Sequence, residues 1–325
     1  MVRILSADDV RPLLDLTAVG AVVDEALVAQ AAGAVERPER PHFPIGRGLD
    51  AERPEEPLGT GLMMAAYVHG SPHFATKVVG VSEGADGETT TAQITLADAE
   101  TGAPVAVMDG GHVTGARTGA IGGLAVRELT DGPITMAVVG TGTQAGWQVR
   151  AIDAMTEIDR AAFYSPNEES RTATAAAARD ELGIEAFSVD DPNLVVGDAD
   201  VVVAATTSEV PVFDGDELGP DTVVLGIGAY TEGMQELDAR TVDRADRILA
   251  DVPEEVTAIG DIAAASPSAD VESLGAFLAG DRPSVDEDAV VVVESVGTAV
   301  VDAAAAEYVY EEAVEADVGT VVSLS

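Results

Sequence analysis

The sequence contains no cysteine, a single lysine and few aromatic residues, which make up 4% of its 325 residues. The absence of cysteine excludes disulfides and thiolate metal sites. No apolar run approaches the roughly 20 residues of a membrane-spanning helix, and the N-terminal residues lack the apolar core of a signal peptide. We therefore expect a cytoplasmic protein.

Basic residues are scarce: 17 lysines and arginines stand against 58 aspartates and glutamates, giving a formal net charge of −41. Because 46% of the residues are hydrophobic, the composition predicts a folded protein with an acidic surface rather than a disordered chain. Surface charges interact over about 30 Å at 0.01 M salt but only about 3 Å at 1 M, so we expect adaptation to a salt-rich cell interior. The same field argues against nucleic acid or an anionic membrane as a partner.

The one lysine, Lys77, lies in the apolar stretch 73–80. A lysine changes its pKa readily on burial and can lose its proton, whereas an arginine stays charged. Lys77 is therefore a candidate general base, or a hydrogen-bond donor whose charge can change beside a substrate carbonyl. The alternative is a strand-edge residue with a packed stem and a solvated ammonium group.

The first part of the chain predicts a long helix over 16–35 and an irregular segment, rich in proline and arginine, over 36–61. Four β-like runs follow and predict a mostly antiparallel sheet. They lie at 62–68, 74–79, 91–97 and 104–108.

From about residue 130, short apolar runs alternate with alanine-rich helical stretches, which is typical of parallel βαβ units. We expect strands at 134–139, 161–164, 185–189, 201–205, 223–227, 247–250 and 290–293, and helices at 143–156, 168–182 and 298–313. The predicted fold class is α/β, with a Rossmann-type dinucleotide-binding domain over 129–299. A smaller α+β domain is expected to comprise 1–128 and 300–325.

A glycine-rich segment opens the first helix of the predicted Rossmann domain. Gly140, Gly142 and Ala145 match G-x-G-x-x-A directly after an apolar strand, the context that a dinucleotide fingerprint requires. The glycines allow close approach of a pyrophosphate, and the helix N-terminus offers unpaired N–H groups to its charge. The candidate pyrophosphate-binding residues are Gly140, Thr141, Gly142, Thr143 and Gln144. A glycine-rich turn without a ligand is the alternative.

The position of the ribose-binding acid, about 20 residues further on, carries no carboxylate. Ser165 and Asn167 are candidates to bind the ribose, and Arg171 is a candidate to meet a 2′-phosphate, unless it is a solvated helix residue. The expected cofactor is therefore NAD(P), with both forms open.

Arg117 and Thr118 lie in a glycine-rich stretch that is expected to lead into the helix before the dinucleotide strand. An arginine there can hold a carboxylate or phosphate with two parallel hydrogen bonds, although an internal salt bridge is a competing interpretation. Arg40 is a weaker candidate of the same kind. The four histidines show no spacing that indicates a metal site.

Taken in order, these segments resemble the ornithine cyclodeaminase and mu-crystallin family, which includes archaeal alanine dehydrogenases. The resemblance runs almost end to end. The segments that carry it are Pro38-Glu-Arg40, Met64-Ala-Ala-Tyr67, Thr76-Lys77-Val-Val79, Thr101-Gly-Ala-Pro-Val-Ala106, Arg117-Thr118, Gly140-Thr-Gly-Thr-Gln144, Gly228 through Glu236-Leu-Asp238, and Ser295-Val-Gly-Thr-Ala-Val-Val-Asp302.

The resemblance implies a homodimer in which the smaller domain supplies both the substrate site and the subunit contact, with the Rossmann domain presenting the nicotinamide. Arg40, Lys77 and Arg117 fall where the family grips the substrate carboxylate, and Lys77 also where it assists chemistry at the α-carbon. Met64 and Thr89 fall near pocket-lining positions. Further candidate cofactor-binding residues are Thr118, Thr206, Thr207, Gly228, Ser295 and Gly297.

One departure from the family concerns Tyr230, which occupies the place of an aspartate that the cyclodeaminases use at the amino group. A phenol with a pKa of about 10 is a poor base at neutral pH but can donate a hydrogen bond. Glu232 is a possible substitute for the acid.

We therefore expect an NAD(P)-dependent oxidoreductase acting on a small α-amino or α-imino acid, either like alanine dehydrogenase or like a cyclic imino acid reductase. Lys77 and Tyr230 are the candidate catalytic residues. The alternatives are an ornithine cyclodeaminase, an ammonia-lyase with recycled NAD, and a non-enzymatic NADPH-dependent binding protein of the mu-crystallin type.

Overall fold

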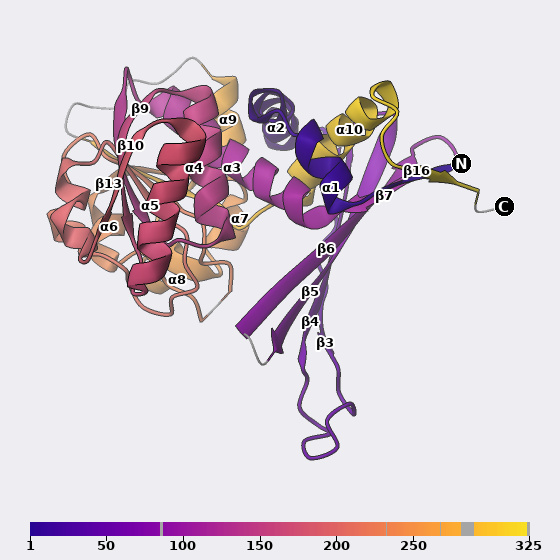
Figure 1. Ribbon diagram of the computed structural model, residues 1–325, viewed down its shortest axis with the longest axis horizontal. Helices are drawn as coiled ribbons and strands as arrows, with labels where there is room; N and C mark the ends of the chain where they lie inside the picture. The colour runs from indigo at the N-terminus through magenta and orange to yellow at the C-terminus, as the bar shows by residue number, and fades with distance from the viewer. Residues whose placement is uncertain (85–86, 232, 267, 281–288, 324–325) are drawn as a thin grey trace. The chain divides into compact units, whose positions relative to one another are not determined.

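A computed structural model describes residues 1–325 except 85–86, 232, 267, 281–288 and 324–325 (Figure 1). The chain forms two compact units. The first comprises Met1–Arg117 together with Thr298–Ser325, and the second comprises Thr118–Gly297. None of the described helices combines the length and the apolarity needed to cross a membrane.

The first unit is built on a sheet with the strand order β16-β1-β7-β6-β5-β4-β2, and β3 also pairs with β4. β1 and β7 are parallel, and all other pairs are antiparallel, which confirms the predicted antiparallel arrangement of the four β-like runs. The strands are β1 (Val2–Leu5), β2 (Val35–Glu36), β3 (His42–Ile45), β4 (Gly59–Val68), β5 (His73–Gly84), β6 (Gly87–Asp98), β7 (Pro104–Asp109) and β16 (Thr320–Val322).

Helices α2 (Leu16–Ala31) and α10 (Ala299–Glu315) pack together, and α10 also lies against β4 and β5. Both begin at a side-chain cap: Asp15 accepts hydrogen bonds from the first turn of α2, and Thr298 from that of α10. The short α1 (Ala7–Val10) starts with a reciprocal capping box and runs into η1 (Arg11–Leu13). Such caps satisfy N–H groups that a helix leaves unpaired, which explains why these helices begin where they do.

The prediction of an irregular chain over 36–61 is wrong in part, because this segment contains β3 and the start of β4. Pro44, which lacks an N–H, obscures the strand in the sequence. A proline is tolerated on an edge strand, and β3 pairs with β4 alone.

The second unit has the strand order β10-β9-β8-β11-β12-β15-β13-β14, and every pair is parallel. Its first strand, β8, lies between β9 and β11, which is the Rossmann arrangement and confirms the predicted fold class. The strands are β8 (Ile134–Val139), β9 (Ile158–Tyr164), β10 (Glu185–Val189), β11 (Val201–Ala204), β12 (Val223–Gly226), β13 (Ala245–Ala250), β14 (Glu272–Ser273) and β15 (Val290–Glu294).

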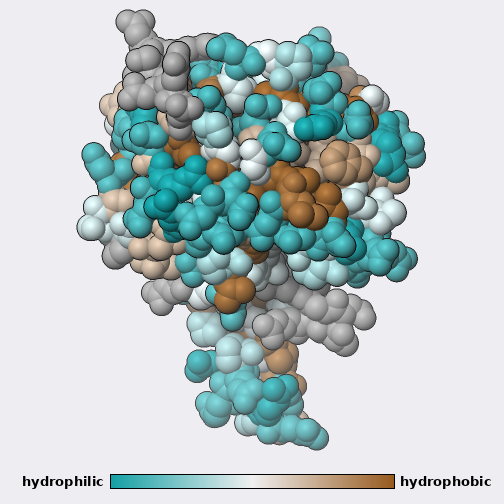
Figure 2. Space-filling model, turned by 90° about the vertical axis from the view of Figure 1, so that its left-hand side faces the viewer, coloured by the Kyte–Doolittle hydropathy of each residue, from teal (hydrophilic) through white to brown (hydrophobic). Residues whose placement is uncertain are grey.

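The longer helices α4 (Thr143–Met155) and α5 (Glu168–Leu182) follow β8 and β9 as predicted. The shorter helices are η2 (Pro192–Leu194), η3 (Val196–Asp198), η4 (Gly215–Glu217), α6 (Ala239–Arg244), α7 (Pro253–Val256), α8 (Gly260–Ala265) and α9 (Leu274–Ala279). Every residue of β11, β12 and β15 is buried, as expected for parallel strands covered on both faces. The face shown in Figure 2 is mostly hydrophilic, in keeping with the acidic composition.

The glycine-rich stretch around Arg117 is itself helical, which corrects the prediction that it leads into a helix. Helix α3 runs from Gly110 to Leu129, so Arg117 lies in its interior. Its glycines serve close packing: a Cβ on Gly119 would lie 2.6 Å from the carbonyl oxygen of Trp147 in α4. Contacts of that kind require a residue without a side chain and override the low helix propensity of glycine.

Candidate active site

Lys77 lies in the middle of the first unit's sheet, on β5, opposite Met64 on β4 and Ile94 on β6. Side chains alternate between the two faces of a strand, and Ala75, Lys77 and Val79 all point to the buried face. Only 3% of the Lys77 surface is exposed. The alternative of a strand-edge lysine with a solvated ammonium group is therefore wrong.

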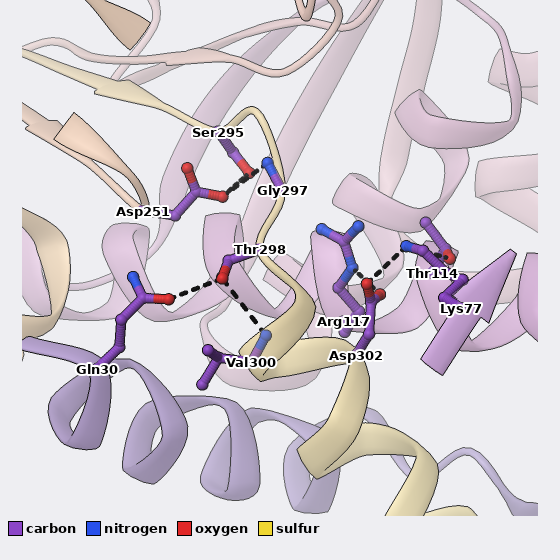
Figure 3. A network of polar contacts seen from close by, with 10 residues as sticks. All are labelled: Gln30, Lys77, Thr114, Arg117, Asp251, Ser295, Gly297, Thr298, Val300 and Asp302. Atoms are coloured by element: carbon purple, nitrogen blue, oxygen red, sulfur yellow. Dashed lines mark hydrogen bonds and ion pairs between the residues drawn. The ribbon is translucent and has the colours of Figure 1, made fainter. Parts of the chain in front are cut away.

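A single carboxylate, that of Asp302 on α10, joins Lys77 to Arg117. Lys77 Nζ lies 2.7 Å from Asp302 Oδ2, and Arg117 Nε donates a hydrogen bond of 2.9 Å to Asp302 Oδ1. Thr114, one turn before Arg117 on α3, accepts a bond of 3.3 Å from Lys77 Nζ. Figure 3 shows this network, in which a strand, an internal helix and the C-terminal helix each contribute a side chain.

The burial of this cluster shifts the pKa values of its members. Burial lowers the pKa of Lys77 to about 8, an effect that Asp302 opposes and that Arg117 and Arg40 reinforce. Burial alone would raise the pKa of Asp302, but the charges of Arg117 and Lys77 hold it below its usual value. Asp302 is therefore ionised at neutral pH, while Lys77 titrates much closer to neutrality than an ordinary lysine.

The other predicted substrate-binding residues lie on the same unit. Arg40 is close enough to Lys77 to act on its pKa, and Met64 is buried at the position paired with Lys77. Thr89 lies on β6 opposite Ser82, and its side chain is outside the part of the chain that the structure describes. The structure thus brings Lys77, Arg117, Arg40 and Met64 together.

Asp302 was not among the residues selected from the sequence. The available signal was its isolation, since it is the only charged residue in the run Ala299-Val-Val-Asp-Ala-Ala-Ala-Ala306. A carboxylate in such an apolar helix is rarely buried without a partner, so its position implied a cation elsewhere in the fold.

In the second unit, the turn between β8 and α4 is open in the way that a pyrophosphate requires. Gly140 has a φ of 112°, and a Cβ there would lie 2.3 Å from the carbonyl oxygen of Ala205. Gly142 caps α4 without a side-chain hydrogen bond, and a Cβ there would meet nothing within 4 Å. The N–H groups of Thr143 and Gln144 therefore begin a helix that has no side-chain cap, and these residues fit a dinucleotide.

The remaining candidate cofactor-binding residues lie at the carboxyl edge of the same sheet, where open α/β sheets bind ligands. Ser165, Asn167 and Arg171 follow β9; Thr206 and Thr207 follow β11; Gly228 follows β12; Ser295 and Gly297 follow β15. Thr118 is the exception, because it lies within α3, where its carbonyl accepts a bond of 2.9 Å from Gln148 Nε2 of α4. Tyr230 lies after β12 and is 41% exposed, and Glu232 is outside the described residues.

Buried carboxylates hold these loops in place. Glu236 accepts main-chain hydrogen bonds from Thr206 after β11 and from Gly228 after β12. Burial raises the pKa of Glu236 to about 7, even though these bonds oppose the shift. Asp251 in the same way accepts bonds of 2.8 Å from Ser295 Oγ and the Gly297 N–H after β15 (Figure 3). Neither acid was selected from the sequence, because nothing in its spacing distinguishes it from the many surface acids.

Three comparisons relate this architecture to known proteins. A model of the ornithine cyclodeaminase/mu-crystallin family matches residues 2–317. The Delta(1)-pyrroline-2-carboxylate reductase of Bacillus cereus is 28% identical over 328 residues, covering 97% of this chain and 98% of the relative. The solved structure of Thermococcus litoralis Delta(1)-pyrroline-2-carboxylate reductase, in complex with NADH and L-proline, matches with a TM-score of 0.90 and 28% identity, over 98% of this chain and 100% of that chain. An archaeal alanine dehydrogenase dimer with bound NAD matches with a TM-score of 0.89 and 26% identity. The match covers 100% of this chain and 99% of that chain.

Replacing Asp302 by asparagine should destabilise the protein strongly, because it leaves the charges of Lys77 and Arg117 buried without a counter-charge. We expect the free energy of unfolding to fall by about 3 kcal/mol or more, measured by denaturant titration at neutral pH. Asp317→Asn, which removes an acid whose side chain is 94% exposed beside Arg3, is the control and should change stability little. Equal stability of the two variants would contradict the role given to Asp302.

Proposed function

We propose, because the chain belongs to the ornithine cyclodeaminase/mu-crystallin family, that it is an NAD(P)-dependent oxidoreductase that reduces a small cyclic α-imino acid to the amino acid. The observation that carries this proposal is the buried contact of Lys77 and Arg117 with Asp302. It places a titratable ammonium group beside a guanidinium group. The names of the Bacillus cereus and Thermococcus litoralis relatives support the substrate class.

The two alternatives are less favoured. The relatives described above are reductases and a dehydrogenase, not ammonia-lyases. Tyr230, at the position where the cyclodeaminases have an aspartate, lacks the basicity that removal of a proton from an amino group requires. A purely ligand-holding role leaves the lowered pKa of Lys77 without a purpose.

The charges of the cluster suit an anionic substrate. Lys77 and Arg117 carry two positive charges against the one negative charge of Asp302, so the buried group has one positive charge in excess. Arg117 meets Asp302 through Nε, and Figure 3 shows its two terminal nitrogens directed away from that carboxylate. These nitrogens are free to bind the substrate carboxylate with two parallel hydrogen bonds, and Arg40 adds a further positive charge.

Lys77 supplies the proton of the reaction. The fingerprint residues Gly140–Gln144 would hold the pyrophosphate of the reduced nicotinamide cofactor, which when bound would supply a hydride for the C=N carbon. The Lys77 ammonium donates a proton to the substrate nitrogen, and this proton together with a hydride at the carbon converts the C=N bond into a C–N single bond. Lys77 then regains a proton from water. Asp302 orients the ammonium group, and we assign to Tyr230 a hydrogen bond to the same nitrogen.

The pH dependence of the reaction should follow Lys77, whose pKa is about 8. As the proton donor, it must be charged for reduction, so reductive kcat/KM should be constant below pH 8 and fall above it. Oxidation of the amino acid needs the neutral amine and should show the opposite trend. Steady-state rates from nicotinamide absorbance, across pH and in both directions, provide the measurement.

Replacing Lys77 by arginine keeps the charge but removes the titration, so turnover should fall by about 100-fold or more while the dinucleotide still binds. Arg160→Lys, at an exposed position of β9, is the control for an arginine–lysine exchange and should leave kcat unchanged. Near-native turnover of the Lys77→Arg variant would rule out the proposed role.

We also propose a homodimer formed through the sheet face opposite α10. That face carries Met63 and Val78, which are 41% and 37% exposed, and the alanine dehydrogenase neighbour is described as a dimer. The double change of Met63 and Val78 to lysine should convert the dimer to a monomer in sedimentation velocity. Leu194→Lys, a 68% exposed position of the second unit, is the control. A double variant that sediments as the unchanged dimer would place the interface elsewhere.

We further propose that the acidic surface adapts the protein to high salt. Since the range of charge repulsion falls from about 30 Å at 0.01 M to about 3 Å at 1 M, the melting temperature should rise as KCl is added. Thermal unfolding in KCl, with an uncharged osmolyte as control, tests this expectation. A melting temperature that stays constant or falls with KCl would contradict it.

A further inference from the structure

We propose that the dinucleotide site of this chain is built for the 2′-phosphate of NADP(H), with Ser165, Asn167 and Arg171 as the phosphate-binding residues. This inference rests on the proposed function and makes its cofactor specific. In Rossmann folds an acid after the second strand binds the ribose 2′-hydroxyl of NAD, whereas an arginine accommodates the additional phosphate of NADP. The residues that follow β9 therefore determine whether the site prefers NAD or NADP.

The end of β9 lies next to the pyrophosphate turn. β8 and β9 are paired in register from Thr135 to Val139, and the Gly140 N–H donates a bond of 2.9 Å to the carbonyl of Tyr164. Thr141 Oγ1 and Ser170 Oγ lie 2.7 Å apart, which ties the turn to the first turn of α5. The residues that follow Tyr164 are therefore those that a ribose next to the pyrophosphate would meet.

These residues are donors rather than carboxylates. Ser165 directly follows the strand, and its hydroxyl oxygen accepts a bond of 3.3 Å from the Asn167 N–H while its own O–H can donate. Asn167 uses its side-chain oxygen to cap α5, accepting a bond of 3.0 Å from the Ser170 N–H, which leaves its amide NH₂ as the group that can donate to a ligand. The next acids along the chain, Glu168 and Glu169, are exposed and follow this cap in the first turn of α5.

Arg171 brings a positive charge to the same place. Its guanidinium reaches back from α5 and donates a hydrogen bond of 3.1 Å to the carbonyl oxygen of Ser165. Among the described residues, Arg171 forms no ion pair with a carboxylate, whereas Arg150 and Arg247 of the same unit bind Glu181 and Glu272. Because a neutral carbonyl, and not a carboxylate, holds this guanidinium at the end of the strand, its positive charge is not neutralised and can bind a phosphate. Because the chain has a net charge of −41, which repels anions, an additional phosphate needs a local positive charge such as that of Arg171.

Binding, rather than activity, tests the inference. Trp147, the only tryptophan, lies on α4 in the turn after the fingerprint, so energy transfer from it to a reduced nicotinamide reports binding of NADPH and NADH. Competition by 2′,5′-ADP is compared with competition by 5′-AMP. Because these two competitors differ only in the 2′-phosphate, the difference measures the contribution of that phosphate to binding. In the wild type at one fixed KCl concentration, we expect NADPH to bind at least about tenfold more tightly than NADH, the effect of one or two charge-assisted hydrogen bonds.

Two variants and a control separate this subsite from the rest of the site. Arg171→Ala should weaken NADPH and 2′,5′-ADP about tenfold and leave NADH nearly unchanged, whereas Ser165→Asp should reverse the preference toward NADH. Arg160→Ala removes the same charge at the opposite end of β9 and should affect neither cofactor. If the wild type binds NADH more tightly than NADPH, or if Arg171→Ala weakens the binding of both cofactors equally, the inference about the 2′-phosphate is overturned but the proposed function is not. Binding of neither cofactor would overturn the proposed function as well.

Discussion

A carboxylate shared between two buried cations is the interaction on which the first unit depends. Asp302 contacts Lys77 from the sheet and Arg117 from α3, and all three are at most 4% exposed. Removing such charges from water costs several kcal/mol for each ion, and only close pairing offsets that cost. The C-terminal helix is thus held to the sheet by the same groups to which we assign the chemistry, so the proposal links stability and function in this unit through one side chain.

The second unit also contains buried carboxylates, but there they hold loops in place. Glu236 and Asp251 are buried acids that accept main-chain N–H groups, and each fixes loops at the carboxyl edge of the parallel sheet. Glycine at 228 is required there, since a Cβ would lie 2.1 Å from the carbonyl oxygen of Thr206. Loops fixed by internal hydrogen bonds lose little entropy when a ligand binds, which favours a preorganised cofactor site.

The contrast between one lysine and many arginines also has a physical explanation. Arg150 and Arg247 form ion pairs and Arg171 reaches a main-chain carbonyl, roles in which a permanent charge is sufficient. In the reaction proposed above the charge of Lys77 changes, and burial lowers its pKa to about 8. Only an amine can meet that requirement near neutral pH.

The sequence by itself determined the fold class and the fingerprint turn and singled out Lys77 as unusual, because strand and helix periodicity, glycine spacing and a unique residue type are local properties. It misread 42–45 and the glycine-rich start of α3, where an edge position and close helix packing override local preference. It marks Asp302 only by its isolation in an apolar run and could not identify its partner Arg117, 185 residues away, or distinguish Glu236 from the surface acids. Only the tertiary structure decides which of the 58 acidic side chains are buried, because burial and the choice of partner arise when segments distant in the sequence pack together in a common core.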